Sequence, residues 1–131
     1  MKDISLVSND GNYELNIYKS DDNVFINLFE YNNYNALFNY QCNTFITGNL
    51  ILHLSKALEK FKSSSCTKMI TSKWYPKFDK GKLINLVKYP SLFIVLERKI
   101  DKEIAYFTLQ LNENTKIKFD TTVDYISHLF I

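Results

Sequence analysis

Residues 47–65, TGNLILHLSKALEKFKSSS, are the stretch whose pattern decides the fold. Five apolar residues recur along it at helical spacing: Leu50, Leu54, Ala57, Leu58 and Phe61. One apolar stripe of this kind is typical of an amphipathic helix that packs on a hydrophobic core. Gly48 allows the chain to turn, and Asn49 is a good N-cap because its side chain can accept a free backbone amide. We therefore predict a helix over residues 49–62.

Segments with strand character flank this helix on both sides. Apolar–polar alternation and β-favouring runs predict strands at residues 4–8, 13–19, 24–31 and 36–42, then 66–72, 83–88, 92–98, 104–111 and 115–119. Short turns such as residues 9–12, NDGN, join neighbouring strands in antiparallel pairs. Two β-meanders around a helix, with no alternation of strands and helices, predict an α+β fold. Its mainly antiparallel β-sheet would pack on the one central helix.

The end of the chain returns to helical spacing. Val123, Ile126 and Phe130 share one helical face, and Thr121 with Asp124 three residues later is similar to a capping box. This pattern predicts a short C-terminal helix over residues 122–130. No internal repeat or low-complexity tract divides the chain, so we expect residues 1–131 to form a single domain.

Composition predicts a folded protein of the cytoplasm. Of its 131 residues, 46% are hydrophobic and 15% aromatic, enough for a real core. Cys42 and Cys66 are too few for a disulfide framework, and we expect two buried thiols in a reducing compartment. The first residues, MKDISLVSND, have no apolar signal region, and no run approaches the roughly 20 apolar residues of a membrane span.

Residues suited to catalysis are sparse. His53 has Lys56 and Lys60 as helical neighbours and no carboxylate to orient it, so we expect all three to be solvated. No pair with the spacing of a zinc site and no glycine-rich phosphate loop occurs in the sequence. We therefore predict a protein that is not an enzyme and has no catalytic residue, cofactor or metal. A dispersed catalytic site around His53 is the enzymatic alternative.

Charge is unevenly distributed along the chain. Residues 1–50 carry two Lys against six Asp and Glu, a net −4, and residues 51–131 carry a net +6. The Lys-rich segment 56–88 also holds aromatic residues, an arrangement used by binders of single-stranded nucleic acid. Only Arg98 is an arginine, however, and arginine is the residue that reads phosphate and guanine in pairs of hydrogen bonds. A protein partner is therefore favoured, and a small nucleic-acid-binding module is the alternative.

Six residues are the candidate contacts for a protein partner, three of them aromatic and three acidic: Trp74, Tyr75, Phe78, Asp21, Asp22 and Glu30. Aromatic side chains are common anchors at protein interfaces. The acidic residues would meet a basic partner. A lone tryptophan also suits a core position, and this alternative for Trp74 stays open.

The order of elements resembles a known class of bacterial proteins. The resemblance lies in the passage from strand to helix at residues 36–61, ALFNYQCNTFITGNLILHLSKALEKF, and in the later hairpin at residues 92–111, LFIVLERKIDKEIAYFTLQL. Both resemble small cytosolic immunity proteins of toxin–immunity pairs, as in contact-dependent growth inhibition and other polymorphic-toxin systems. The resemblance implies that the chain binds a cognate toxin domain and blocks its active site. Inhibitors of nucleases in such pairs are often acidic, whereas this chain has a net charge of +2, so a basic toxin would have to meet its acidic first half.

Overall fold

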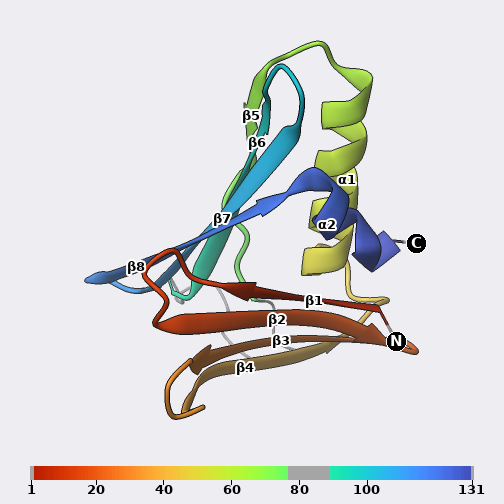
Figure 1. Cartoon of the computed structure of the whole chain (residues 1–131). Coiled ribbons are helices and arrows are strands. Elements are labelled where there is room, and N and C mark those ends of the chain that lie inside the picture. The colour runs from red at the N-terminus through yellow and green to blue at the C-terminus, as the bar shows by residue number, and fades with distance from the viewer. Residues whose placement is uncertain (1, 77–88, 131) are drawn as a thin grey trace.

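The computed structural model describes residues 2–76 and 89–130, which form two four-stranded antiparallel sheets, one long helix and a short C-terminal helix (Figure 1). The elements in order are β1 Lys2–Val7, β2 Tyr13–Ser20, β3 Asn23–Glu30, β4 Ala36–Asn43, α1 Leu50–Ser63, β5 Lys68–Ile70, β6 Ser91–Arg98, β7 Glu103–Asn112, β8 Thr115–Thr122, α2 Val123–Ser127 and the 3-10 turn η2 His128–Phe130. The predicted α+β class is confirmed. The strand expected at residues 83–88 lies outside the described residues.

Both sheets follow the chain order, β1-β2-β3-β4 and β5-β6-β7-β8. The sequence predicted one mainly antiparallel sheet, and the structure divides its strands between two sheets, one on each side of α1 in the chain. Every neighbouring pair within a sheet is antiparallel and consecutive in sequence. Short connections join the strands of the first sheet and those from β6 to β8, whereas residues 71–90 separate β5 from β6.

The first hairpin shows how local chemistry sets a turn. Gly11 has a φ of +78°, a conformation that glycine adopts without steric cost. The Ser8 hydroxyl donates to Asp10 Oδ1 at 2.6 Å and accepts from the Tyr13 amide at 2.9 Å. Asp10 Oδ1 also accepts from the Asn12 amide at 3.0 Å. The hydrogen bonds from the Ser8 hydroxyl, first, and the Asn12 amide, second, hold the pKa of Asp10 below its ordinary value. The turn is thus closed around a charged carboxylate.

Helix α1 begins as the sequence predicts. Asn49 is its N-cap, and Asn49 Oδ1 accepts from the Leu52 amide at 2.9 Å. The amide nitrogen of the same side chain donates to the carbonyls of Thr44 and Ile46, both at 2.9 Å. Asn49 is only 4% exposed, yet its polar atoms are hydrogen-bonded, which is what a buried amide requires.

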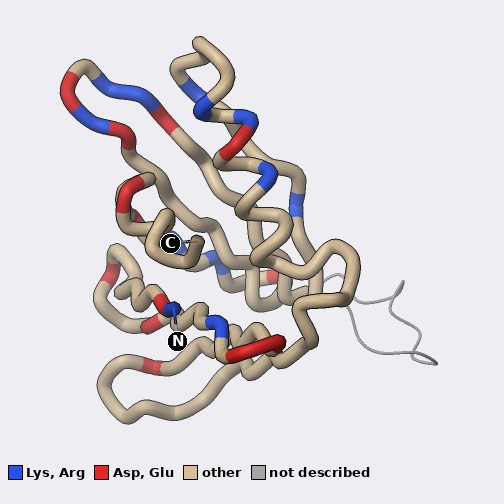
Figure 2. Tube along the Cα trace, turned by 90° about the vertical axis from the view of Figure 1, so that its right-hand side faces the viewer, with Lys and Arg blue, Asp and Glu red and all other residues tan. Residues whose placement is uncertain are grey.

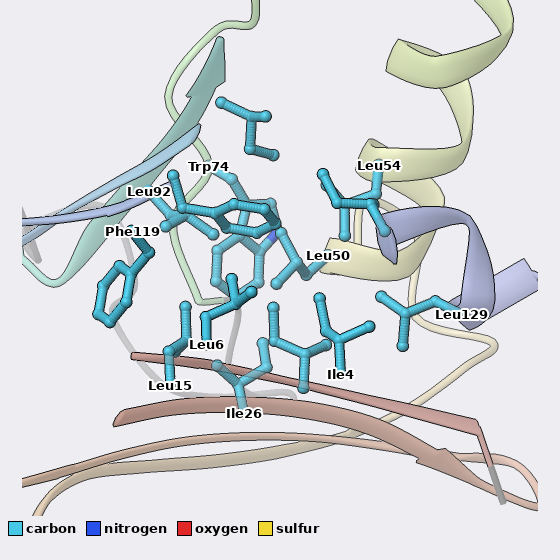
Figure 3. Packing of buried hydrophobic residues seen from close by; sticks show 14 of the residues in the cluster. Ile4, Leu6, Leu15, Ile26, Leu50, Leu54, Trp74, Leu92, Phe119 and Leu129 are labelled. Atoms are coloured by element: carbon cyan, nitrogen blue, oxygen red, sulfur yellow. The ribbon is translucent and has the colours of Figure 1, made fainter. Parts of the chain in front are cut away.

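The core lies where the two sheets and α1 meet, and one hydrophobic cluster joins all three. Figure 3 shows side chains from each layer pointing into it, among them Ile4, Leu15 and Ile26 of the first sheet, Leu50 and Leu54 of α1, and Leu92 and Phe119 of the second sheet. The predicted stripe of α1 is buried at four of its five positions, Leu50, Leu54, Leu58 and Phe61. Ala57 is half-buried, and Ile51 joins the buried face instead.

The C-terminal helix consists of α2 and the 3-10 turn η2, and its N-cap lies one residue later than expected. Thr122, not Thr121, is the N-cap of α2, and its hydroxyl accepts from the Tyr125 amide at 3.1 Å. The Tyr125 hydroxyl reaches β1, where it accepts from the Ser5 amide at 3.0 Å and donates to the Ser5 carbonyl at 3.2 Å. This contact satisfies backbone groups on the free edge of β1 and ties the end of the chain to its beginning.

None of the helices within residues 2–76 and 89–130 is both long and apolar enough to cross a membrane.

Candidate functional site

The face of the first sheet that points away from the core is the main candidate surface. Alternation places one set of side chains inside, with Leu15, Ile17 and Ile26 buried. In Figure 1 no described helix or strand lies beneath β1–β4 on the opposite side. The outward set comprises Asp3, Ser5, Val7, Glu14, Asn16, Tyr18, Phe25, Asn27, Phe29, Asn39 and Gln41. We call this set the outer face.

Aromatic rings occupy the middle of the outer face. Tyr18 and Phe25 are opposite each other on β2 and β3, and their rings stack with centroids 4.7 Å apart and planes 10° apart. Phe29 lies further along β3, opposite Glu14. All three rings are half-buried against their neighbours while one side remains open. Stacked rings in a sheet are held rigidly, so they lose little freedom when a partner covers them.

An amide row runs across the sheet beside these rings. The strand register places Asn16 opposite Asn27, Asn27 opposite Asn39, and Ser5 opposite Asn16. Asn16 Nδ2 donates to the Ser5 hydroxyl at 3.0 Å, which aligns the two side chains. An amide both donates and accepts hydrogen bonds without carrying charge, so such a row can pair with polar groups of a partner at low desolvation cost.

Carboxylates surround the outer face. In Figure 2 the β1–β4 half carries mostly acidic residues, whereas α1 and the second sheet carry acidic and basic residues together, with Lys and Arg the more numerous. Asp3 stands opposite Tyr18, and Glu14 lies on the face itself, opposite both Val7 and Phe29. The described segment 2–43 contains two Lys and six Asp and Glu, a net −4. An uncharged aromatic and amide centre with an acidic border is therefore the physical character of this surface.

The three acidic candidates lie at opposite ends of this sheet. Asp21 and Asp22 form the exposed turn between β2 and β3, where Asp21 has a φ of +52°. Glu30 ends β3, so roughly 25 Å separates it from Asp22 at the usual strand rise. The structure thus does not bring the three together in one cluster. Instead Asp21 and Asp22 lie at one end of the outer face, and Glu30 lies at the other end of the sheet, on the side that alternation shares with Leu28.

Trp74 belongs to the core. It is 6% exposed, its Nε1 donates to the Gly48 carbonyl at 2.8 Å, and its ring meets Tyr40 edge-on with centroids 5.7 Å apart. Its backbone pairs with Leu92 of β6. The ring therefore joins the second sheet to the first and to the start of α1. We remove it from the candidate contacts, because a buried ring has no face to offer a protein or a nucleic-acid base.

The other two aromatic candidates are Tyr75 and Phe78. Tyr75 is 37% exposed directly after Trp74, so it remains available to a partner. Phe78 lies outside the described residues. Most of the exposed lysines that remain in the segment 56–76 belong to α1 and β5. These elements lie apart from the outer face of the first sheet.

His53 is not on a solvated face, contrary to the sequence prediction. Its ring is half-buried against residues 69–72, and burial lowers the pKa of His53 below its ordinary value, which the backbone of Ser72 partly opposes. Its Nε2 is buried and has no hydrogen-bond partner among the described residues. Cys66 also departs from expectation, since it is exposed whereas Cys42 is buried.

Within the described parts of the chain, no three His, Cys, Asp or Glu residues are grouped so that they could hold a metal ion. The chain matches no protein-family model, no curated protein and no solved structure. The case for function therefore depends on the surfaces of the molecule.

The sequence contained part of the signal for the outer face. Alternation along residues 13–19 and 24–31 already separated Tyr18, Phe25 and Asn27 from the apolar positions. It could not give the register, and only the register aligns the asparagines of three strands in one row.

Proposed function

We propose that this chain is a non-enzymatic binding protein of the cytoplasm, an immunity protein that neutralises a cognate toxin domain by covering its active site. The observation that carries this proposal is the outer face, with its stacked Tyr18 and Phe25, its amide row and its acidic border. Aromatic residues are enriched at protein interfaces, and charged residues are depleted at their centres. The outer face has this composition.

The charge of the border supports a partner of the opposite charge. Carboxylates around an uncharged centre speed the approach of a basic surface and repel an acidic one. A toxin that acts on nucleic acid needs a basic active site to bind phosphates. Such a site is complementary to the outer face in charge, so a nuclease-like toxin domain is the partner class that we propose.

Co-expression is the direct test of this function. The toxin domain encoded by the neighbouring upstream gene would be induced in a susceptible host with and without this chain. We expect the chain to restore growth and to co-purify with the toxin domain as a stable complex. An upstream product that remains toxic and does not bind the chain would contradict the pairing.

A charge-matched comparison then locates the surface. Asp21→Lys with Asp22→Lys changes the acidic border at the β2–β3 turn and should slow association with the toxin domain, most strongly at low salt. Asp101→Lys with Glu113→Lys makes the same charge change on the turns of the second sheet. Equal slowing by both pairs would show that net charge, not the border of the outer face, steers the partner.

A further inference from the structure

A groove lies between the side of α1 and the free edge of β5, on a part of the molecule that the proposed function does not use. Its volume is about 360 Å³. One wall consists of His53, Lys56 and Lys60 from α1, and the other is the backbone and side chains of residues 69–72. Exposed Ile70 borders the opening, with 61% of its surface accessible.

Among residues 2–76 and 89–130, no strand pairs with the outer edge of β5, so its backbone presents hydrogen-bonding groups along this groove. Thr71 donates to the Ile94 carbonyl and Arg98 donates to the Thr67 carbonyl, so positions 67, 69 and 71 face β6. In an antiparallel pair the intervening residues point their amides and carbonyls the other way. The backbone groups of Lys68 and Ile70 therefore point to the free edge, since β5 is the outer strand of its sheet.

The groove also has a positive wall. Lys56 and Lys60 are one helical turn apart, both are exposed, and neither forms an ion pair within the described residues. Glu59, the acidic residue between them in sequence, lines a different hollow with Ser55 and Lys62. Lys68 adds a further exposed lysine on the strand side. Among the residues that the structure describes, those lining the groove include no carboxylate.

From these two observations we propose that the groove binds an extended acidic peptide segment of another protein. The segment adds as a strand to the free edge of β5, and its carboxylate side chains meet Lys56 and Lys60. Strand addition obtains affinity from backbone hydrogen bonds and specificity from alternate side chains. This inference stands apart from the proposed function, because it concerns another surface and an occupant of the opposite charge.

Charge argues against two other occupants. A second copy of this chain paired edge to edge through β5 would bring the lysines of both grooves together, and like charges at a shared edge are unfavourable. A nucleic acid would use the lysines but not the strand edge, and the described residues that line the groove include no aromatic side chain for a base to stack on.

The test uses the intact chain and synthetic peptides of about seven residues, long enough to span an edge strand. One labelled, end-blocked peptide alternates Glu and Val, and its counterpart alternates Lys and Val. Fluorescence anisotropy should show binding of the acidic peptide only, weakened as salt rises from about 50 to about 500 mM. N-methylation of the peptide residues whose amides face β5 should abolish binding, whereas N-methylation of the intervening residues should leave it intact.

Variants of the chain examine the two walls separately. Lys56→Glu with Lys60→Glu should weaken binding of the acidic peptide by about tenfold or more, and the matched pair Lys99→Glu with Lys102→Glu on the β6–β7 turn should not. Ile70→Pro removes an amide that faces the free edge and is not needed by β6, so it should abolish binding. Ile70→Val, which retains that amide, should bind normally.

Three results would overturn the inference. The first is no binding of the acidic peptide at low salt. The second is binding that neither N-methyl series nor Ile70→Pro alters, which would show adhesion by charge alone. The third is competition by an oligothymidine that depends on Lys56 and Lys60, which would assign the groove to nucleic acid. The N-methyl peptides keep the test decisive even where Ile70→Pro impairs folding, because they use the unaltered chain.

Discussion

The guanidinium of Arg98 lies over the ring of Phe61, with its central carbon 4.0 Å from the ring centroid, and donates to the Phe61 backbone carbonyl. Arg98 also donates to the Cys66 carbonyl at 2.6 Å and to Glu103 Oε2 at 3.0 Å. One β6 side chain thereby closes the C-terminal end of α1, where backbone carbonyls lack helical partners and a cation is favoured. It joins the helix to the second sheet.

Arg98→Lys should destabilise the chain although it keeps the positive charge. A lysine cannot reach all three acceptors or lie flat on the ring, so we expect a loss of about 1–3 kcal/mol in the free energy of unfolding. Urea denaturation measures it. Lys99→Met is the control, because the ion pair of Lys99 with Glu97 at 3.3 Å is a single surface contact whose lysine side chain is 52% exposed, and it should contribute little. Equal losses in both variants would contradict the role of Arg98.

Leu54→Ala examines the contact of α1 with both sheets. Leu54 is 1% exposed, and its truncation leaves a cavity, so the free energy of unfolding should fall by about 2–5 kcal/mol. Leu52→Ala, at a half-buried position of the same helix, should cost clearly less. Thermal melting that hardly changes for Leu54→Ala would show that α1 does not organise the core.

Trp74 is the only tryptophan, so its fluorescence reports on the core directly. We expect emission at short wavelength and weak quenching by acrylamide in the folded chain, with a red shift on unfolding. Addition of a bound partner should leave this emission unchanged, because Trp74 is 6% exposed and lies between the sheets. Strong quenching in the native chain would place the ring at the surface and return it to the candidate contacts.

Stability should fall in mild acid because of His53. Burial lowers its folded-state pKa below the ordinary 6.5, so the unfolded chain binds a proton first as the pH falls. The charged groups that line the groove beside it are Lys56 and Lys60, and residues 69–72 contribute none. The free energy of unfolding should therefore decrease from above pH 6.5 down to the folded-state pKa.

His53→Gln isolates this effect, because the two proteins differ only at this one imidazole. The urea concentration at the midpoint of unfolding should decrease between about pH 7.5 and about pH 5.5. This decrease should be larger for the original chain than for His53→Gln. The same pH dependence in both would show that His53 is not shielded from water.

Much of the fold could be predicted from the sequence because it depends on local residue patterns. Helix α1 followed from its stripe and its Asn49 cap, and the strands of the first sheet followed from alternation and from turns such as that at Gly11. The division into two sheets was not readable. It depends on long-range contacts, such as Trp74 with Tyr40 and Tyr125 with Ser5, which have no sequence signature.

The candidate site was less predictable for the same reason. Asp21 and Asp22 lie between the predicted strands 13–19 and 24–31, where the structure has a turn, but nothing in the sequence could show how far Glu30 lies from them in the sheet. His53 looked solvated because its helical neighbours are lysines. Its burial comes from residues 69–72, which a helical pattern does not include.

The central claim is that the outer face of the first sheet binds the partner, and calorimetric affinity for the toxin domain tests it most directly. Asn27→Arg places a bulky cation in the middle of the amide row, and Thr108→Arg makes a comparable change on the outward side of β7. We predict that Asn27→Arg weakens binding by about a hundredfold or more, while Thr108→Arg and the unaltered chain bind alike. Unchanged affinity for a folded Asn27→Arg variant would contradict the account.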